Sequence, residues 1–246
     1  MTGSMDSDVA VVVGAGGGIG RALIEALRGD PRFAHVIGLA RRRPSAMADD
    51  AGHTWLEADI LDAPSLAAAA RRIAEFGAPT RIIVATGVLH GPGLSPEKSL
   101  RALRADALSR LFQINAIGPA LVAQQLLPLT PRDRPSVFAA LSARVGSIAD
   151  NALGGWYGYR ASKAALNMLI HTAAIEHARS HPLAVCVAIH PGTVATPLSR
   201  PFVGPAPAGR ALSPQVAADR ILATLDGLGP HNTGGFYASD GDPIPW

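Results

Sequence analysis

A tyrosine and a lysine lie four residues apart in the segment Tyr159-Arg-Ala-Ser-Lys163. On a helix, residues four apart share one face. A tyrosine with a pKa near ~10 is a poor base at neutral pH unless a nearby cation stabilises its phenolate. Lysine is rare in this chain, since the 22 basic residues are 20 arginines plus Lys98 and Lys163, and chance seldom makes such a pair. The pair predicts a general acid/base that exchanges a proton with a substrate oxygen.

A glycine-rich run near the N-terminus is the second candidate site. It reads Gly14-Ala-Gly-Gly-Gly18-Ile-Gly20, after the apolar run Val9–Val13 and ahead of a predicted helix. Glycines let the backbone approach a pyrophosphate, and a helix N-terminus supplies N–H groups and positive potential. The residues expected to bind a dinucleotide here are Gly14, Gly16, Gly17, Gly18, Ile19 and Gly20. The alternative is a tight strand-to-helix turn without a ligand.

The end of the second apolar run bears on the type of dinucleotide. An acidic residue there would bind the ribose 2′-hydroxyl of NAD(H). This chain instead has Ala40 followed by Arg41 and Arg42, whose guanidinium groups suit a 2′-phosphate. We therefore expect NADP(H) to be favoured over NAD(H); a solvated basic turn is the alternative. Asp59, after the run Trp55-Leu-Glu-Ala, could accept from the adenine amino group or serve only as a helix cap.

These residues need a scaffold, and the apolar pattern predicts one. Runs of strand length alternate with longer segments of helical spacing. Continuous apolar strands between helices indicate an α/β fold with a parallel sheet covered on both faces. The predicted strands are Val9–Val13, His35–Leu39, the run ending at Asp59, Arg81–Ala85, Ser136–Leu141, Leu183–Ile189 and Gly235–Ala238. The predicted helices are Ile19–Leu27, Leu66–Phe76, Leu100–Leu127 (broken near Gly118-Pro119), Trp156–Arg179 and Pro214–Leu228.

One long stretch lacks any such pattern. Pro197–Ser213 holds four prolines and two glycines. A structureless segment of this length within a compact domain is usually functional. We interpret it as a lid over a substrate pocket, with a disordered surface loop as the alternative.

Composition excludes several classes of function. Apolar residues make up 48% of 246 residues, which is enough for a sizeable core. Basic residues are scattered and aromatics are only 5%, so a nucleic-acid partner is not expected. No apolar run is long enough for a membrane helix, no signal peptide is visible, and the single Cys186 cannot form an internal disulfide or a cysteine zinc site. We expect a cytoplasmic protein without a metal site.

The motifs together resemble the short-chain dehydrogenase/reductase superfamily. The resemblance rests on GAGGGIG, Asn115 in a helix, a serine after the fifth strand, YRASK and the segment Pro191-Gly-Thr-Val-Ala-Thr196, all in the family's order. The stretch GSIADNALGGWYGYRASKAALN looks closest to the branch of sniffer-type carbonyl reductases and C-factor-like signalling proteins. The resemblance implies a single-domain Rossmann fold over residues 1–246, doubly wound, with about seven parallel strands.

The resemblance also implies roles for individual residues. Tyr159 would be the general acid/base, and Lys163 would hydrogen-bond the nicotinamide ribose and lower the pKa of Tyr159. Asn115 would hold a water that links Lys163 to solvent. Val194 and Thr196 would bind the carboxamide and the diphosphate. Further expected cofactor contacts are Asp59, Ile60, Thr86, Gly87, Pro191 and Gly192.

Two departures from the family pattern affect the site. The usual Asn-Asn-Ala-Gly after the fourth strand is Val84-Ala-Thr-Gly87 here. Related chains carry two serines where this chain has Ser142-Ala143, and the second normally polarises the carbonyl. Because side chains alternate along a strand, Ser142 could face the wrong way. Either a bulge turns Ser142 inward, or Ser147 substitutes, or the contact is lost; we expect Ser142 to act.

The leading hypothesis is an oxidoreductase that transfers a hydride between NADP(H) and a carbonyl or alcohol substrate. The alternative is an NADP(H)-binding sensor or signalling protein with weak or vestigial catalysis. Expected partners are a small-molecule substrate and further copies of the chain, because the family implies a homodimer or homotetramer.

Overall fold

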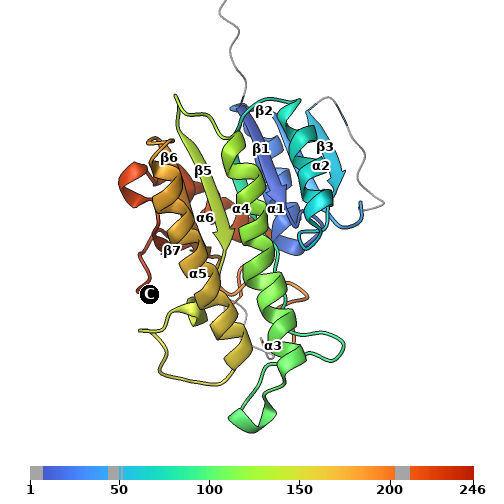
Figure 1. Cartoon of the computed structure of the whole chain (residues 1–246), viewed down its shortest axis with the longest axis vertical. Coiled ribbons are helices and arrows are strands. Elements are labelled where there is room, and N and C mark those ends of the chain that lie inside the picture. Colours follow the sequence, from blue (N-terminus) through green and yellow to red (C-terminus); the bar gives the residue numbers. More distant parts are fainter. Residues whose placement is uncertain (1–7, 44–49, 51, 203–210) are drawn as a thin grey trace, which may run out of the picture.

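The computed structural model describes residues 8–43, 50, 52–202 and 211–246. Within them, seven strands form one parallel sheet in the order β3-β2-β1-β4-β5-β6-β7 (Figure 1). They are β1 (Asp8–Val13), β2 (Phe33–Ala40), β3 (His53–Glu57), β4 (Pro79–Val84), β5 (Ser136–Leu141), β6 (Ala184–His190) and β7 (Phe236–Ala238). The predicted doubly wound parallel sheet of about seven strands is confirmed.

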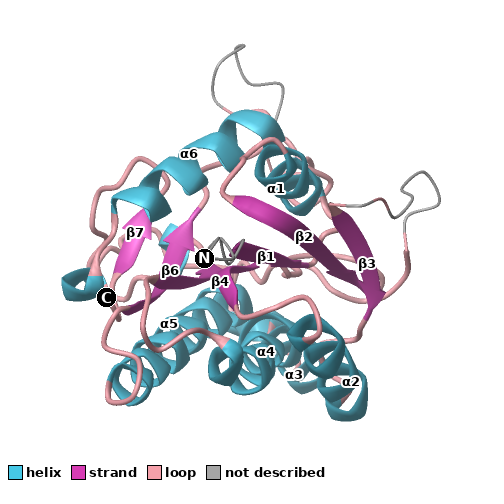
Figure 2. Ribbon diagram, turned by 90° about the horizontal axis from the view of Figure 1, so that it is seen from above, coloured by secondary structure: helices cyan, strands magenta, loops and turns pink. Residues whose placement is uncertain are grey.

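Helices cover both faces of this sheet (Figure 2). Helices α1 (Gly18–Arg28) and α6 (Pro214–Gly227) lie on one face, and α2 (Ala63–Ala74), α4 (Gly118–Leu126) and α5 (Tyr157–Ala178) on the other. Strand β1 shows why its sequence is continuously apolar: Ala10 and Val12 pack in the α1/α6 layer, whereas Val9, Val11 and Val13 pack in the opposite layer. Successive side chains point to opposite faces, so a strand buried on both sides needs apolar residues throughout.

The order of the strands creates a crevice beside β1. The chain winds from β1 outward through β2 and β3, then returns to place β4 on the other side of β1. The loops leaving β1 and β4 therefore diverge at the carboxyl end of the sheet. In open α/β sheets ligands bind at such a point.

The predicted helix over Leu100–Leu127 is wrong in detail. Leu100–Ala102 is a short 3₁₀ turn, α3 spans Ala105–Phe112, and a π-helical turn over Gln113–Ile117 joins α3 to α4 without a break. Proline has no N–H, so Pro119 cannot give the Asn115 carbonyl its α-helical hydrogen bond. The N–H of Gly118 reaches back five residues to the Gln113 carbonyl, and the wider turn takes Pro119 into the start of α4.

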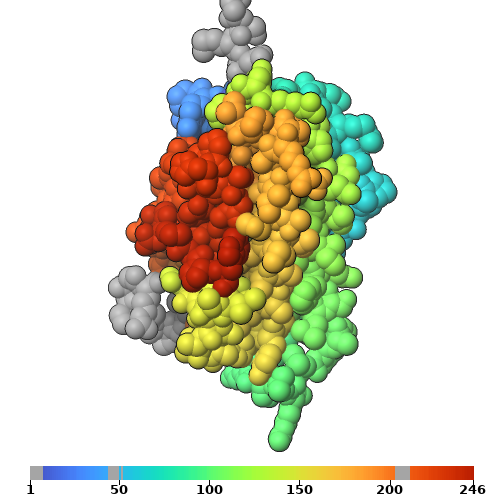
Figure 3. All heavy atoms as spheres, turned by 60° about the vertical axis from the view of Figure 1, so that its left-hand side comes forward, coloured from blue at the N-terminus to red at the C-terminus, as the bar shows by residue number. Residues whose placement is uncertain are grey.

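The C-terminal residues lie against α5 (Figure 3). The Trp246 ring is 5.4 Å from that of His171 on α5 and 5.9 Å from that of Phe236 on β7, between centroids. The Trp246 carbonyl accepts a 2.8 Å hydrogen bond from the Ala149 N–H. The C-terminus thereby anchors the loop between β5 and α5, which borders the cavity described next. No helix within the described ranges is long and apolar enough to cross a membrane.

Candidate active site

A cavity of about 800 Å³ opens at the carboxyl ends of β1, β4, β5 and β6. It is lined by the glycine-rich loop, by the segments that follow these strands and by the first turns of α5. The predicted site residues that line it are Gly16, Gly17, Gly18, Ile19, Gly20, Thr86, Gly87, Ser142, Tyr159, Lys163, Pro191, Gly192, Val194 and Thr196. Segments far apart in sequence therefore meet at one place, the crevice predicted by the strand order.

The glycine-rich loop has the backbone form that a phosphate cradle needs. Gly14 has φ +84°, a left-handed conformation that favours glycine, and its N–H donates to the Leu39 carbonyl at 2.8 Å. A Cβ on Gly18 would lie 2.9 Å from the Thr196 methyl group. Gly17 is the N-cap of α1, and it makes no side-chain hydrogen bond to the N–H groups at the start of that helix. The loop fits a dinucleotide diphosphate through its open backbone.

Two arginines follow β2, directly beside this loop. A Cβ on Gly16 would lie 3.7 Å from that of Ala40, the last residue of β2. Arg41 and Arg42 come next and are exposed. Their guanidinium groups form no ion pair or hydrogen bond within the described part of the chain. Two unpaired cations thus stand at the point where the sequence predicts the 2′-phosphate of the adenosine ribose.

Asp59 and Ile60 do not line the cavity. Asp59 Oδ1 accepts a 3.0 Å hydrogen bond from the Leu61 N–H in a local turn. The cap of α2 is Asp62, so Asp59 is not the helix cap that the sequence offered as an alternative. Ile60 is buried, and its position leaves no room for a Cβ on Gly118 of α4.

Tyr159 and Lys163 occupy the first two turns of α5, as predicted, and both are buried at the cavity. Lys163 Nζ lies 6.0 Å from the centroid of the Tyr159 ring and donates to the Leu141 carbonyl at 2.8 Å. Burial raises the pKa of Tyr159 to about 12 and lowers that of Lys163 to about 7. The expected lowering of the Tyr159 pKa by Lys163 is therefore not seen, because desolvation dominates both groups.

The Asn115 side chain holds the loop after β4. Its Oδ1 accepts from the Val88 N–H at 2.8 Å, and its Nδ2 donates to the Val88 carbonyl at 2.9 Å and to Ser162 Oγ at 3.1 Å. A Cβ on Gly87 would lie 3.5 Å from Asn115 Oδ1 and 3.7 Å from Lys163 Nζ. The amide thus packs Gly87 close to Lys163. Its main chain lies in the π-helical turn, where Pro119 offers the Asn115 carbonyl no N–H.

The serine positions differ from the family pattern in geometry as well as in sequence. Ser142 lines the cavity, but its hydroxyl donates to Asn167 Oδ1 on α5 at 2.6 Å. A serine hydroxyl has one hydrogen, so it cannot at the same time donate to a substrate. Ser147 Oγ accepts from the Asp150 N–H at 3.1 Å and does not line the cavity. Ala143, whose side chain has no donor, lines it instead and packs against the cluster around Tyr159.

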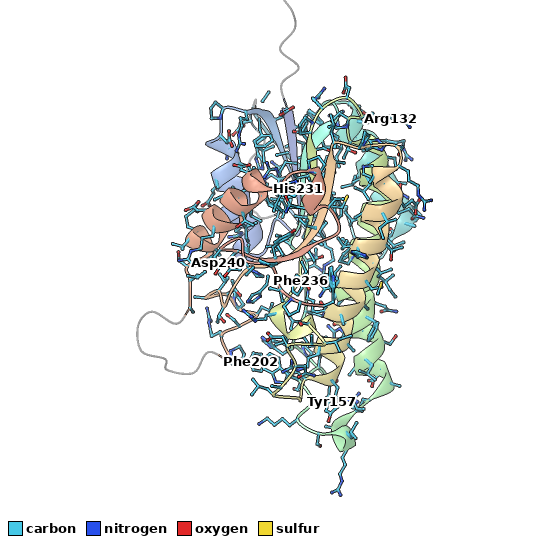
Figure 4. The ribbon with its side chains drawn as sticks, turned by 90° about the vertical axis from the view of Figure 1, so that its left-hand side faces the viewer. Arg132, Tyr157, Phe202, His231, Phe236 and Asp240 are labelled. Atoms are coloured by element: carbon cyan, nitrogen blue, oxygen red, sulfur yellow. The ribbon has the colours of Figure 1, made fainter. Side chains whose placement is uncertain are left out.

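The end of the cavity beyond Tyr159 is apolar and aromatic. The Trp156 ring meets those of Tyr159 and Phe202 edge to face, with centroids 6.2 and 5.0 Å apart. Phe202 in turn contacts His90 at 5.5 Å. Figure 4 shows Phe202 toward the same end of the molecule as Tyr157, the first residue of α5. Leu153, three residues before Trp156, is 93% exposed and forms no part of this wall.

The described part of the expected lid borders the cavity. Pro197, Leu198 and Phe202 line it, and the Pro197 carbonyl lies 3.1 Å from His90 Nε2. At the far end, Leu212 pairs with Val194 through hydrogen bonds of 2.8 and 2.9 Å to the flanking residues. Residues 203–210 of the expected lid lie outside the described residues.

Three residues near the site were missed by sequence reasoning. Asn167 lies one turn beyond Lys163 on the same face of α5, and that spacing was a usable signal. His190, the last residue of β6, lines the cavity, and burial lowers its pKa to about 4. Glu97 is buried beside the start of α5 and carried no local signal, since its contacts lie about 60 positions away. Within the described ranges, no group of His, Cys, Asp and Glu could hold a metal ion.

Comparison with protein families places most of the chain in one of them. Residues 8–204 match the family described as short chain dehydrogenase. The chain is 31% identical over 188 residues to a 1-hydroxy-2-glutathionyl-2-methyl-3-butene dehydrogenase of Rhodococcus sp. (strain AD45), covering 76% of this chain and 78% of that protein. It is 36% identical over 140 residues to the C-signal protein of Myxococcus xanthus, covering 56% of this chain and 78% of that protein.

Solved structures agree in fold. The carbonyl reductase Sniffer of D. melanogaster superposes with a TM-score of 0.84 at 23% identity, covering 98% of this chain and 99% of that chain. A short-chain dehydrogenase/reductase of Burkholderia multivorans with bound NADP gives a TM-score of 0.78 at 25% identity, covering 98% of this chain and all of that one. Of the two branches that the sequence resembled, the sniffer type is represented here by a structure of the same fold, and the C-factor-like type by a protein similar in sequence.

Proposed function

Because the chain belongs to the short-chain dehydrogenase family of oxidoreductases, we propose that it transfers a hydride between NADP(H) and a carbonyl or alcohol substrate. One observation carries the proposal. Tyr159 and Lys163 are buried one turn apart at the cavity that the glycine-rich loop also lines. A phenol beside an ammonium, next to a phosphate cradle, suits proton exchange at an oxygen during hydride transfer.

In this proposal Tyr159 is the general acid of carbonyl reduction and the general base of alcohol oxidation. Burial disfavours the phenolate and the ammonium individually, so the charge on Tyr159 is best developed together with that on Lys163. Lys163 is held in place by the Leu141 carbonyl, and Asn115 keeps Gly87 packed beside it. The bound nicotinamide supplies or accepts the hydride. The glycine-rich loop and Thr196 hold the diphosphate, and Val194 holds the carboxamide.

We assign polarisation of the carbonyl to the Tyr159 hydroxyl. The Ser142 hydroxyl donates its hydrogen to Asn167, Ser147 does not line the cavity, and the Ala143 side chain has no donor. Asn167 lies on the same helix as Tyr159 and Lys163. Ser142 therefore acts as a positioning residue that ties the end of β5 to α5.

NADP(H) is the cofactor that the charges favour. Arg41 and Arg42 are exposed, and unpaired among the described residues, at the end of β2, where an acidic residue would bind the 2′-hydroxyl of NAD(H). The structure of the Burkholderia multivorans relative is described with bound NADP, which supports the same choice.

The second candidate function is an NADP(H)-binding sensor or signalling protein with vestigial catalysis. The likeness to the C-signal protein of Myxococcus xanthus and the lack of a serine donor at the cavity favour it. Both functions require dinucleotide binding, so turnover alone distinguishes them. Purified protein with NADPH and a panel of aliphatic, aromatic and α,β-unsaturated carbonyl compounds provides the test. An oxidoreductase consumes NADPH with at least one of them, whereas tight NADPH binding without turnover across the panel supports the sensor.

We further propose that the protein works in the cytoplasm as a homodimer that pairs through α5. Met168 and Ile175, spaced seven residues apart on that helix, are 64% and 52% exposed. Apolar side chains at this spacing form a stripe that a second helix can cover. Light scattering after gel filtration, on wild type and on Met168→Glu, tests it. A dimer that the charge converts to a monomer supports the pairing, and a wild-type monomer contradicts it.

A further inference from the structure

The catalytic helix α5 begins without a cap of its own. Its N-cap residue is Trp156, whose side chain offers no hydrogen-bond acceptor. The first N–H groups of a helix have no partner within the helix and need acceptors from elsewhere. Tyr159 is the third residue of this helix, so the acceptor that holds the first turn also holds the proposed acid/base.

The acceptor comes from the loop ahead of α3, close to the start of α5 in Figure 1. Glu97 Oε2 accepts a 3.1 Å hydrogen bond from the N–H of Gly158, the second residue of α5. The main-chain carbonyl of Glu97 accepts from the Trp156 N–H at 2.5 Å. One residue thus accepts hydrogen bonds from two N–H groups, two residues apart, at the helix entrance. Its carboxylate also faces the positive end of the helix dipole.

Packing leaves Glu97 little freedom. Its side chain is buried, and Oε1 has no hydrogen-bond partner of its own. A Cβ on Gly158 would lie 2.8 Å from Glu97 Oε1 and 2.6 Å from Leu111 of α3. A side chain at position 158 would therefore displace the carboxylate or the leucine from its present position. Burying a carboxylate that is not paired with a cation among the described residues costs free energy. The hydrogen bond to Gly158 and the positive end of the helix dipole must offset that cost.

Glu97 also holds the residue next to Tyr159 in the aromatic wall. Trp156 has φ +52°, and it is the one non-glycine residue with positive φ in the described part of the chain. Such a conformation is strained for a residue with a side chain and persists only where the surroundings impose it. The hydrogen bond to the Glu97 carbonyl fixes the Trp156 backbone, and the ring then meets those of Tyr159 and Phe202.

We propose that Glu97 is a positioning residue that caps the catalytic helix from the α3 loop and thereby holds Tyr159 and Trp156 in reacting geometry. The proposal rests on the proposed function for its kinetic consequence, though the cap itself does not. Lys163, one turn deeper and held by Leu141, depends on the cap less than Tyr159 does. The cofactor loop after β1 is built from other elements and does not depend on it.

Three variants separate this role from general stabilisation. Glu97→Gln keeps an acceptor oxygen at the same reach, Glu97→Asp keeps the charge but shortens the reach, and Glu97→Ala removes both. Glu176→Ala is the matched control, an exposed glutamate near the other end of the same helix. The measurements are kcat, the Kd for NADPH and amide hydrogen exchange of residues 157–163, with β6 as the internal reference.

We expect Glu97→Asp and Glu97→Ala to lower kcat by about tenfold, the effect of losing a helix cap of about 1.4 kcal/mol. In these two variants the Kd for NADPH stays within twofold of wild type, and amide exchange of residues 157–163 accelerates by about tenfold. In Glu97→Gln, kcat and the exchange rate stay within about threefold of wild type. Wild-type exchange and kcat in both Glu97→Asp and Glu97→Ala would overturn the proposal. So would equal loss in Glu97→Gln, or acceleration that spreads equally to β6.

The amide hydrogen exchange measurement tests the cap even if the protein has no measurable turnover. If wild type consumes no NADPH with any carbonyl, the proposed function fails, while faster exchange confined to the first turns of α5 still supports the cap. If Glu97→Ala does not fold, Glu97→Asp and Glu97→Gln carry the same comparison. Unchanged exchange at residues 157–163 in Glu97→Asp then overturns it.

Discussion

The Ser142 hydroxyl donates a 2.6 Å hydrogen bond to the side-chain carbonyl of Asn167, between the end of β5 and helix α5. Both residues are buried, at 4% and 2% exposure. The distance is typical of an O–H···O bond, with the Ser142 hydroxyl as the donor. The serine that survives from the family's pair is thus engaged in holding the catalytic helix, and Ala143 occupies the place beside it.

The first prediction concerns substitutions at Ser142 and Ala143. Ser142→Ala should lower the free energy of unfolding by about 1 kcal/mol, as expected for one buried hydrogen bond, and change kcat little. Ala143→Ser should raise kcat for carbonyl reduction by roughly tenfold or more, because a new donor near the carbonyl oxygen stabilises developing charge. Urea unfolding and steady-state kinetics on both variants check this. A large loss of kcat in Ser142→Ala without a stability change would contradict the assignment.

The sequence predicted the scaffold better than it predicted these contacts. Continuous apolar runs locate β1 and β4, and the glycine-rich run locates the loop between β1 and α1. Both signals depend only on a few neighbouring residues. The π-helical turn at Gln113–Ile117 depends on how the chain absorbs Pro119, and periodicity alone predicted a break instead. The direction of Ser142 and the reach of Glu97 depend on residues 25 and 61 positions away, which no local pattern encodes.

The arginines after β2 give the second prediction. Arg41→Ala should weaken NADPH binding by about tenfold or more while leaving NADH within about threefold, because a hydrogen bond to a charged group contributes about 1.5–3 kcal/mol. Arg42→Ala should act in the same direction. Titration calorimetry with both nucleotides measures it, with Arg28→Ala as a control, since Arg28 already pairs with Asp50. Equal weakening of NADPH and NADH by Arg41→Ala would refute the 2′-phosphate assignment.

The third prediction concerns the charge of Lys163. Burial lowers its pKa to about 7, so its ammonium should lose a proton near neutrality in the nucleotide-free protein. The chain has only two lysines, Lys98 and Lys163, so carbon-13 labelling at the lysine ε position gives two signals, and Lys98→Arg assigns them. The Lys163 signal should shift with a midpoint near pH 7. A midpoint above pH 9 would show that the site does not desolvate it.

A stacked histidine pair at the end of α5 gives the fourth prediction. The rings of His177 and His181 lie 4.0 Å apart, and His177 Nε2 is 3.0 Å from Thr130 Oγ1. Burial, with a smaller contribution from His181, lowers the pKa of His177 from 6.5 to about 4. A histidine kept neutral in the folded state contributes stability above its unfolded pKa and loses it as pH falls.

Unfolding stability should therefore decline as pH falls from about 6.5 to about 4, with His177 contributing at most about 3 kcal/mol of the loss. His177→Gln, which cannot gain a proton, should flatten the decline over that range. Urea unfolding at pH 7.5, 6, 5 and 4 measures it. An unchanged slope in His177→Gln would assign the acid sensitivity to other groups, such as His190, whose pKa burial also lowers to about 4.

The central claim is that Tyr159 delivers the proton that accompanies hydride transfer. The most direct measurement is a single-turnover rate of NADPH oxidation, under saturating carbonyl substrate, in wild type and Tyr159→Phe, alongside the Kd for NADPH. We expect the rate to fall by at least about 10²-fold, the usual contribution of a positioned general acid, with NADPH affinity within threefold. A Tyr159→Phe enzyme that oxidises NADPH at the wild-type rate would show that Tyr159 is not the proton donor.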